Sequence, residues 1–173
     1  MTIQTSRLEL IPATAALIRL EINNPAALGL ALNAQVSPDW PPEEVRDVLP
    51  FFAMQAETQV EDWGIFYWVT QAEPRVLVGS GGFKGGPGSG GLVEIGYGTL
   101  TEFQGRGYAT EAARGLAEFA LSQPGIVSVV ADALPENRPS VRVLEKSGFI
   151  EIGPGAEAGT CRYVYRRPDE AFI

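Results

Sequence analysis

The sequence of 173 residues contains no histidine and a single cysteine, Cys161. Without histidine, neither a Ser-His-Asp nor a Cys-His nucleophile can form, and a histidine-ligated zinc site is excluded. A lone cysteine can form no internal disulfide, and we expect it to be a small core residue on a late strand. Any general base must therefore be a carboxylate, a lysine, a tyrosine or a relayed water.

Long apolar runs and an excess of positive charge are also missing. No run can span a bilayer, and the start MTIQTSRLEL lacks a basic segment followed by an apolar one, so we expect neither a membrane partner nor secretion. A cytoplasmic location fits, although a periplasmic protein poor in cysteine would look similar. The formal net charge is −8 and neither half of the chain is basic, so we expect no nucleic-acid partner. An acidic surface is compatible with a cationic substrate.

Composition and pattern predict one domain over residues 1–173. Hydrophobic residues make up 45% and charged residues 20%, as in ordinary globular proteins, and no linker or repeat divides the chain. Alternation, capping and turn residues predict a mixed α/β (α+β) layer structure. Strands are expected at residues 7–11, 65–70, 75–84, 92–99, 126–133, 149–152 and 160–166. Helices are expected from Thr14 and over residues 26–34, 42–56, 108–123 and 139–147.

The most informative segment runs from Glu94 to Glu111 (EIGYGTLTEFQGRGYATE). A strand leads into a glycine-bearing loop that opens a helix, where backbone N–H groups lack intrahelical partners and the helix dipole is positive. Residues 104–110 are therefore suited to a pyrophosphate, although a tight strand–helix turn that binds nothing has the same pattern. No Gly-Lys-Ser/Thr occurs, so a P-loop is absent, and a Rossmann fingerprint is incomplete because Thr110 replaces its third glycine.

Several segments together resemble the GNAT superfamily of acyl-CoA N-acyltransferases. Gln104–Ala109 (QGRGYA) is similar to its Q/R-x-x-G-x-G/A loop, and Glu94–Tyr97 (EIGY) is similar to its fourth strand. Residues 135–140 (PENRPS) and 143–149 (VLEKSGF) resemble its N-x-x-S…L-E-K-x-G-F segment. Residues 5–10 (TSRLEL) resemble the start of the RimJ/RimL-like branch, which acetylates protein N-termini and other amines. The resemblance covers essentially the whole chain. It implies a mixed, mostly antiparallel sheet with splayed fourth and fifth strands and helices on both faces.

The resemblance also implies acetyl-CoA as the co-substrate and no metal. Its pyrophosphate would bind the loop, its pantetheine arm would lie along residues 98–100 as a pseudo-strand, and its thioester carbonyl would point at an N–H near Thr99. Asn137 would hydrogen-bond the arm, or it is only a helix cap. Arg138, Arg142 and Lys146 could meet the 3′-phosphate. The donor-binding residues implied in this way are Gly98, Thr99, Leu100, Gln104, Gly105, Arg106, Gly107, Tyr108, Ala109, Thr110, Asn137 and Ser140.

Glu94 and Ser140 are the catalytic residues that the resemblance implies. An amine attacks only after losing a proton, and a carboxylate at the place of Glu94 often removes it in this family; a surface-facing or salt-bridged acid is the alternative. Many members carry a tyrosine seven residues after the asparagine, where it protonates the departing thiolate. Leu144 stands there in this sequence, so Ser140 would supply the proton or orient a water. Leu144 also keeps open a non-catalytic acyl-CoA-binding or sensor domain, and a nucleotide-binding module is a third hypothesis.

The expected reaction is direct transfer of an acetyl group from acetyl-CoA to a primary amine. A covalent acyl-enzyme is not expected, because no histidine can activate Cys161. A protein N-terminus and a small-molecule amine fit equally well. Asp39 and Trp40 could recognise the amine through charge and cation–π contacts, and a packed tryptophan in a proline-stiffened loop is equally consistent. Both a monomer and a homodimer are compatible with the sequence.

Overall fold

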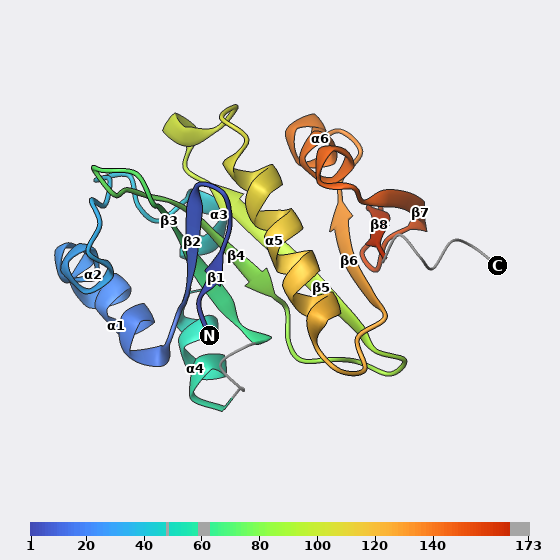
Figure 1. Ribbon diagram of the computed structural model, residues 1–173, viewed down its shortest axis with the longest axis horizontal. Coiled ribbons are helices and arrows are strands. Elements are labelled where there is room, and N and C mark those ends of the chain that lie inside the picture. Colours follow the sequence, from blue (N-terminus) through green and yellow to red (C-terminus); the bar gives the residue numbers. More distant parts are fainter. Residues whose placement is uncertain (48, 59–62, 167–173) are drawn as a thin grey trace.

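The sheet has eight strands in the order β1-β2-β3-β4-β5-β6-β8-β7 (Figure 1). The computed structural model describes residues 1–47, 49–58 and 63–166. The strands are β1 (Ile3–Gln4), β2 (Leu8–Pro12), β3 (Ile65–Thr70), β4 (Leu77–Phe83), β5 (Leu92–Thr99), β6 (Ser128–Ala133), β7 (Ile150–Pro154) and β8 (Cys161–Tyr165). Neighbouring strands are antiparallel except for β5 and β6, which are parallel, so the predicted mostly antiparallel sheet is confirmed.

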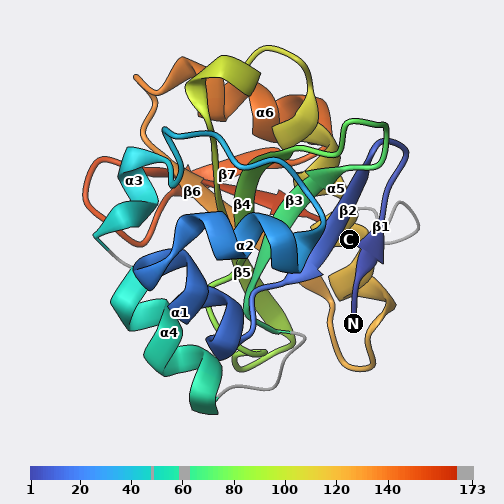
Figure 2. The same ribbon diagram turned by 90° about the vertical axis from the view of Figure 1, so that its left-hand side faces the viewer.

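Helices cover both faces of this sheet (Figures 1 and 2). They are α1 (Ala15–Asn23), α2 (Pro25–Leu32), α3 (Glu43–Arg46), α4 (Leu49–Thr58), α5 (Tyr108–Ser122) and α6 (Arg138–Ser147). Strand β3 shows the two faces by its alternation, because Phe66 and Trp68 join the core under α5 and α6, and Tyr67 and Val69 join the core under α1, α2 and α4. All four side chains are buried, as expected for a strand covered on both sides.

The predicted helix over residues 42–56 is instead two helices, α3 and α4. The reason is Pro50, which lacks an N–H and is tolerated in the first turn of a helix but not in its interior. A new helix therefore begins at Leu49. Val48, which the sequence placed on the apolar stripe, lies outside the described residues. The other predicted helices and strands are found with ends that shift by about two residues.

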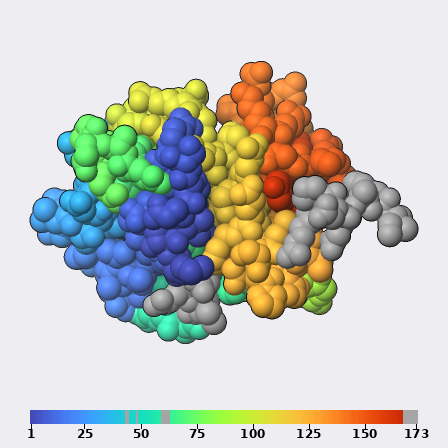
Figure 3. Space-filling view, in the orientation of Figure 1, coloured from blue at the N-terminus to red at the C-terminus, as the bar shows by residue number. Residues whose placement is uncertain are grey.

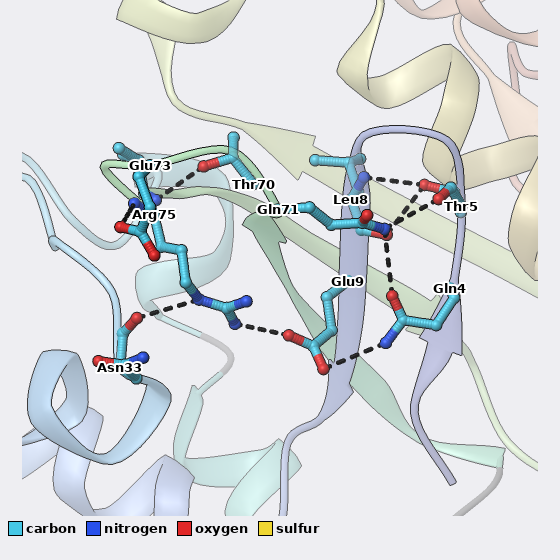
Figure 4. A network of polar contacts seen from close by, with 10 residues as sticks. Gln4, Thr5, Leu8, Glu9, Asn33, Thr70, Gln71, Glu73 and Arg75 are labelled. Atoms are coloured by element: carbon cyan, nitrogen blue, oxygen red, sulfur yellow. Dashed lines mark hydrogen bonds and ion pairs between the residues drawn. The ribbon is translucent and has the colours of Figure 1, made fainter.

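The short strand β1 was not predicted, because two residues carry no periodic pattern. It pairs with β2, and polar contacts fix the resulting hairpin to the turn after β3 (Figure 4). The Gln71 amide donates to the carbonyl oxygens of Thr5 and Leu8, at 2.9 and 3.0 Å. The Arg75 guanidinium binds the Glu9 carboxylate at 2.5 Å. These contacts hold the first residues of the chain in place beside α5.

Strands β5 and β6 separate after a short paired stretch (Figure 1). They pair at three positions, of which the last joins Glu94 to Val130. Beyond Glu94, β5 continues to Thr99 beside β4, while β6 continues beside β8. Because β1 was not predicted, β5 and β6 are the fourth and fifth strands of the expected sheet. Their predicted splay is thus confirmed, and Glu94 lies at the point where they part.

None of the helices within residues 1–47, 49–58 and 63–166 has the length and apolar character needed to traverse a lipid bilayer. Cys161, on β8, is partly buried and packs against the main core, as the sequence indicated.

Candidate active site

A cleft of about 500 Å³ opens between the end of β5, the loop before α5, and α6. Figure 3 shows it as a notch at the top of the molecule, between the yellow residues that precede α5 and the orange α6. It is lined by Tyr97, Gly98, Thr99, Phe103, Gln104, Gly105, Gly107, Tyr108, Ala109, Thr110, Asn137, Pro139, Ser140, Arg142, Val143 and Lys146. The structure therefore brings together all the donor-binding residues expected from the sequence except Leu100 and Arg106.

The wall formed by the loop has the features of an anion site. Gly105 and Gly107 have φ angles of +74° and +81°, which suit glycine, and a Cβ built on Gly105 would meet nothing within 4 Å. Gly107 is the N-cap of α5 and supplies no side-chain hydrogen bond to the first turn. The backbone N–H groups that open α5 thus face a cleft in which an anion can approach them closely.

Arg7 fixes this loop from behind. Its guanidinium donates to the carbonyl oxygen of Arg106 at 3.0 Å and lies 4.8 Å from the centre of the Tyr108 ring. The Glu111 carboxylate accepts from Arg7 Nε at 2.7 Å and from the Thr5 hydroxyl at 2.6 Å. Partial burial works to raise the pKa of Glu111, but the hydrogen bonds from Thr5 and Arg7 outweigh it and hold the pKa below its usual value. Thr5 and Arg7, which belong to the segment 5–10 that resembles the family, therefore support the loop of the cleft. The sequence alone did not predict their contact with Glu111.

The second wall is the free edge of β5. Leu100 N–H donates to the Val78 carbonyl, and the Glu94 carbonyl accepts from Lys84 N–H, so even-numbered residues turn their backbone groups toward β4. In an antiparallel pair, the odd-numbered residues then point theirs the other way, toward the gap that β6 has left. Tyr97 and Thr99 present that edge. Of residues 98–100, which the resemblance placed along the arm, Thr99 turns its backbone groups to the gap, whereas Gly98 and Leu100 turn theirs toward β4.

The side chain of Leu100 also lies away from the cleft. It is 4% exposed and packs in the core on the opposite face of the sheet. Thr99 remains in the cleft, where its carbonyl accepts from the Gln104 amide at 3.1 Å and its buried hydroxyl has no protein partner. A strand edge and an orphaned hydroxyl are groups that an amide-bearing arm can satisfy, so these residues fit the pantetheine of acetyl-CoA.

The third wall is the first two turns of α6. Asn137 caps this helix by accepting from Ser140 N–H at 3.4 Å, and it also lines the cleft. The Tyr97 hydroxyl reaches across to Ser140, 3.3 Å from its carbonyl oxygen and 3.4 Å from its hydroxyl oxygen. Burial raises the pKa of Tyr97 to about 12, although the hydrogen bond to Ser140 opposes the rise. Leu144 is fully buried, as its apolar character suggested.

Glu94 lies outside the cleft. Its side chain projects on the face opposite to Tyr97, where the Lys84 ammonium binds it at 2.7 Å and the Arg162 guanidinium approaches at 3.5 Å. Arg162 is itself paired with Asp132 at 2.7 Å. Lys84 also lies across Gly96, because a Cβ built there would be 3.2 Å from Lys84 Cε. The structure thus shows the salt-bridged arrangement that the sequence left open.

Trp40 is packed and does not face an open acceptor site. Its side chain is 4% exposed, and its indole N–H donates to the Glu21 carboxylate at 2.7 Å. The Tyr67 hydroxyl donates to the other Glu21 oxygen at 2.5 Å. The structure therefore supports the packed tryptophan and not cation–π recognition by Trp40, while Asp39 remains exposed beside it.

The side chains of the described residues form no group of three or more histidine, cysteine or carboxylate ligands suited to a metal ion. A parted pair of strands with a free edge, next to an uncapped helix start, can hold a ligand that has amide groups along an extended arm and a pyrophosphate at one end.

The chain belongs to the GNAT acetyltransferase family, whose acetyltransferase (GNAT) domain matches residues 7–150. The uncharacterized N-acetyltransferase YjdG of Bacillus subtilis (strain 168) is 30% identical over 127 residues, which are 73% of this chain and 76% of the relative.

Solved structures share the fold. An acetyltransferase from Agrobacterium tumefaciens str. C58 has a TM-score of 0.64 at 24% identity, over 96% of this chain and 95% of the other. RimL, a ribosomal L7/L12 α-N-protein acetyltransferase in complex with coenzyme A, has a TM-score of 0.62 at 21% identity, over 96% and 98%. As a family member, the protein is an N-acetyltransferase that takes its acetyl group from acetyl-CoA.

Proposed function

We propose that the enzyme acetylates a primary amine by direct attack on acetyl-CoA, and that the amine is a protein N-terminus or a small molecule of the kind used by the RimJ/RimL-like branch. The observation that carries the proposal is the splay of β5 and β6, because it gives the donor and the amine separate approaches to the same gap. The donor cleft opens on the side of α5 and α6, and the Glu94 carboxylate lies where β5 and β6 part, on the other face. The branch assignment is supported by residues 5–10, whose Arg7 and Thr5 bind Glu111 at the start of α5.

The donor-binding roles follow from the three walls. The amides from Gln104 to Thr110 would hold the pyrophosphate, and the backbone edge of Tyr97 and Thr99 would hold the pantetheine. Asn137 would add a hydrogen bond from the α6 wall. Arg142 and Lys146 line the outer part of the cleft and suit the 3′-phosphate, whereas Arg138 does not line it. Acetyl-CoA supplies an activated acetyl group whose sulfur leaves as a thiolate.

Glu94 is proposed as the base for the amine. Gly96 and Gly98 carry no side chains on the same face, and Lys84 lies across Gly96. An acceptor would therefore approach β5 between Glu94 and the donor cleft as Lys84 moves aside. The Lys84 ammonium occupies the place that a substrate ammonium would take on the carboxylate, so substrate binding exchanges one ammonium for another. Ser140, in the opposite wall, is proposed to protonate the departing sulfur. Alignment of the two reactants supplies much of the acceleration.

Donor binding and acceptor use can be tested together. At one hundred times its dissociation constant, a ligand bound only by the folded state adds about 2.7 kcal/mol to the free energy of unfolding. Acetyl-CoA and CoA should therefore raise the melting temperature by several degrees, and ATP and NAD should have little effect. A panel of peptides, amino acids, polyamines and aminoglycosides, assayed for CoA release, should contain at least one substrate. Equal stabilisation by ATP would refute the donor site, and donor binding without any acetylated amine would refute the proposed class of acceptor.

A further inference from the structure

Two hydroxyl groups on opposite walls of the donor cleft lie within reach of each other. The Tyr97 hydroxyl comes from β5, and the Ser140 hydroxyl comes from the first turn of α6; their oxygens are 3.4 Å apart. Both residues line the cleft. Their contact joins β5 to α6, the helix that follows β6, so it crosses the gap that the parting of β5 and β6 leaves. In the proposed reaction Ser140 protonates the departing sulfur, and the Tyr97 hydroxyl has no assigned role.

The Tyr97 ring is held in place by its surroundings. It packs beside Trp68, with ring centres 6.4 Å apart, and lies opposite Gly81 on β4. A Cβ built on Gly81 would come within 2.6 Å of the Gly96 carbonyl oxygen and of the Tyr97 Cβ, so glycine is what allows β4 to lie this close to β5 at Tyr97. A ring fixed in this way points its hydroxyl at one place in the cleft.

The phenol hydrogen is present but weakly engaged. Burial raises the pKa of Tyr97 to about 12, so the hydroxyl remains protonated throughout the pH range of an acetylation assay. Its contacts with Ser140 are 3.3 and 3.4 Å, whereas a good O–H···O hydrogen bond is about 2.7–2.8 Å. The hydrogen can therefore turn toward a better acceptor that enters the cleft.

Besides the Thr99 hydroxyl, few other groups in the described residues can give a proton inside the cleft. Leu144 is apolar and buried, and Glu94 lies on the opposite face. Arg142 and Lys146 are exposed and lie two and six residues beyond Ser140 on α6. Tyr108 lies at the loop, against Arg7. The Tyr97–Ser140 pair is the group that joins β5 to the start of α6.

We propose that Tyr97 and Ser140 act as one proton-donating unit for the sulfur that leaves during acetyl transfer, an inference that rests on the proposed function. The amine nitrogen forms a bond to the acetyl carbon, the carbon–sulfur bond breaks, and its electron pair stays on sulfur. Ser140 gives its hydroxyl proton to the sulfur and takes the proton of Tyr97, which solvent then restores. Glu94 passes to solvent the two protons that the ammonium nitrogen loses, one before the attack and one as the amide forms. Overall, a protonated amine and acetyl-CoA give an amide, CoA and one proton.

Binding without turnover provides the first test. Tyr97→Phe and Ser140→Ala should weaken the binding of CoA by about tenfold at pH 10, where a large fraction of the thiol is ionised and a hydrogen bond to it is strong. The same variants should bind desulfo-CoA, which lacks the sulfur, as the wild type does. A phenylalanine keeps the packing of the ring, and the serine variant tests the same unit if the phenylalanine variant fails to fold.

Turnover provides the second test. Each variant should lower kcat on the order of 10²-fold at every pH, with little change in KM for the amine. The double variant should lose no more than the worse single variant, because groups that act as a unit are not additive. Tyr163→Phe is the matched control, because its hydroxyl lies 3.3 Å from Glu151 on β7, outside the cleft.

The outcomes separate the two proposals. If Tyr97→Phe retains the wild-type kcat and the wild-type ratio of CoA to desulfo-CoA affinity, Tyr97 has no part in proton donation. Losses that multiply in the double variant would overturn the claim that the residues act as a unit. If the wild type itself neither binds CoA nor acetylates an amine, the proposed function fails.

Discussion

At the scale of single residues, the Lys84 ammonium and the substrate ammonium would compete for the Glu94 carboxylate. In the structure the carboxylate binds Lys84 at 2.7 Å, while the proposed reaction requires it to receive a substrate ammonium and then a proton. An exposed ion pair of this kind contributes little to stability, so exchanging one ammonium for another costs little. The pair therefore does not prevent Glu94 from acting as a base, but it predicts competition between Lys84 and the substrate.

Glu94→Gln should lower kcat on the order of 10²-fold near neutral pH, because an amide keeps the shape of the side chain but cannot accept a proton. The loss should diminish at high pH, where the amine is already deprotonated. The affinity for acetyl-CoA should not change, since Glu94 lies outside the cleft. Steady-state rates across pH and calorimetric titration of acetyl-CoA measure the two effects.

Lys84→Met is the second variant to test, since it leaves the Glu94 carboxylate in place and removes the cation nearest to it. It should lower KM for the amine and leave acetyl-CoA binding unchanged. A fully active Glu94→Gln variant at pH 7 would place the base elsewhere.

At the scale of elements, the start of the chain supports the loop that opens α5. The β1–β2 turn supplies Arg7, and the first turn of α5 supplies Glu111. The Arg7 guanidinium binds Glu111 and also donates to the loop carbonyl of Arg106. Gly107 has a φ of +81°, so a valine there would strain the loop even without a ligand. A substitution of Arg7 therefore probes the loop more cleanly than a substitution of the glycine itself.

Arg7→Met should weaken acetyl-CoA binding by about tenfold, because charge-assisted hydrogen bonds of this kind are each worth about 1.5–3 kcal/mol and only part of that is felt at the loop. The effect should appear in KM for acetyl-CoA and not in KM for the amine. Arg19→Met is the control, since Arg19 pairs with Glu57 between α1 and α4, away from the cleft. Equal acetyl-CoA affinity in the two variants would contradict a role for Arg7 in the loop.

The same scale shows what the sequence could and could not predict. The strand, loop and helix from Glu94 to Glu111 were predictable because their signals are contiguous: glycines, a helix start and an apolar stripe. The Tyr97–Ser140 and Arg7–Glu111 contacts join residues 43 and 104 positions apart, and alternation could place Tyr97 on the core face but not at Ser140. Trp40 was ambiguous for the same reason, because its partner Glu21 is known only from the packing.

At the scale of the whole molecule, two cores lie on opposite faces of one sheet, and a buried carboxylate belongs to the second. Glu21 ties α1 to Trp40 and to Tyr67 on β3. Burial raises the pKa of Glu21 above its ordinary value of 4.5, although the hydrogen bonds from Tyr67 and Trp40 oppose the rise. The folded protein therefore holds this proton more tightly than the unfolded chain, and folding stability decreases as the pH rises through the interval between the two pKa values.

Glu21→Gln should remove this component of the pH dependence. The free energy of unfolding of the wild type should decrease relative to that of the variant as the pH rises above 4.5, by no more than about 1.4 kcal/mol per pH unit. Tyr67→Phe should extend the interval to higher pH, because it removes a hydrogen bond that stabilises the carboxylate. Urea titrations between pH 4.5 and 8 measure both, and parallel curves for the wild type and Glu21→Gln would contradict the assignment.

The splay has a consequence for how such a protein can diverge from its relatives. The cleft residues fall between Tyr97 and Lys146, whereas the helices that cover the other face, α1 to α4, fall between Ala15 and Thr58. Under the proposed function the amine approaches Glu94 from the face that these helices cover, so the donor cleft and the cover of the acceptor side belong to separate blocks of sequence. Substitutions in the first block can change the amine while leaving the donor residues untouched, so the identity of the acceptor is to be sought in the first third of the chain, where a signature common to all acetyl-CoA users is least expected.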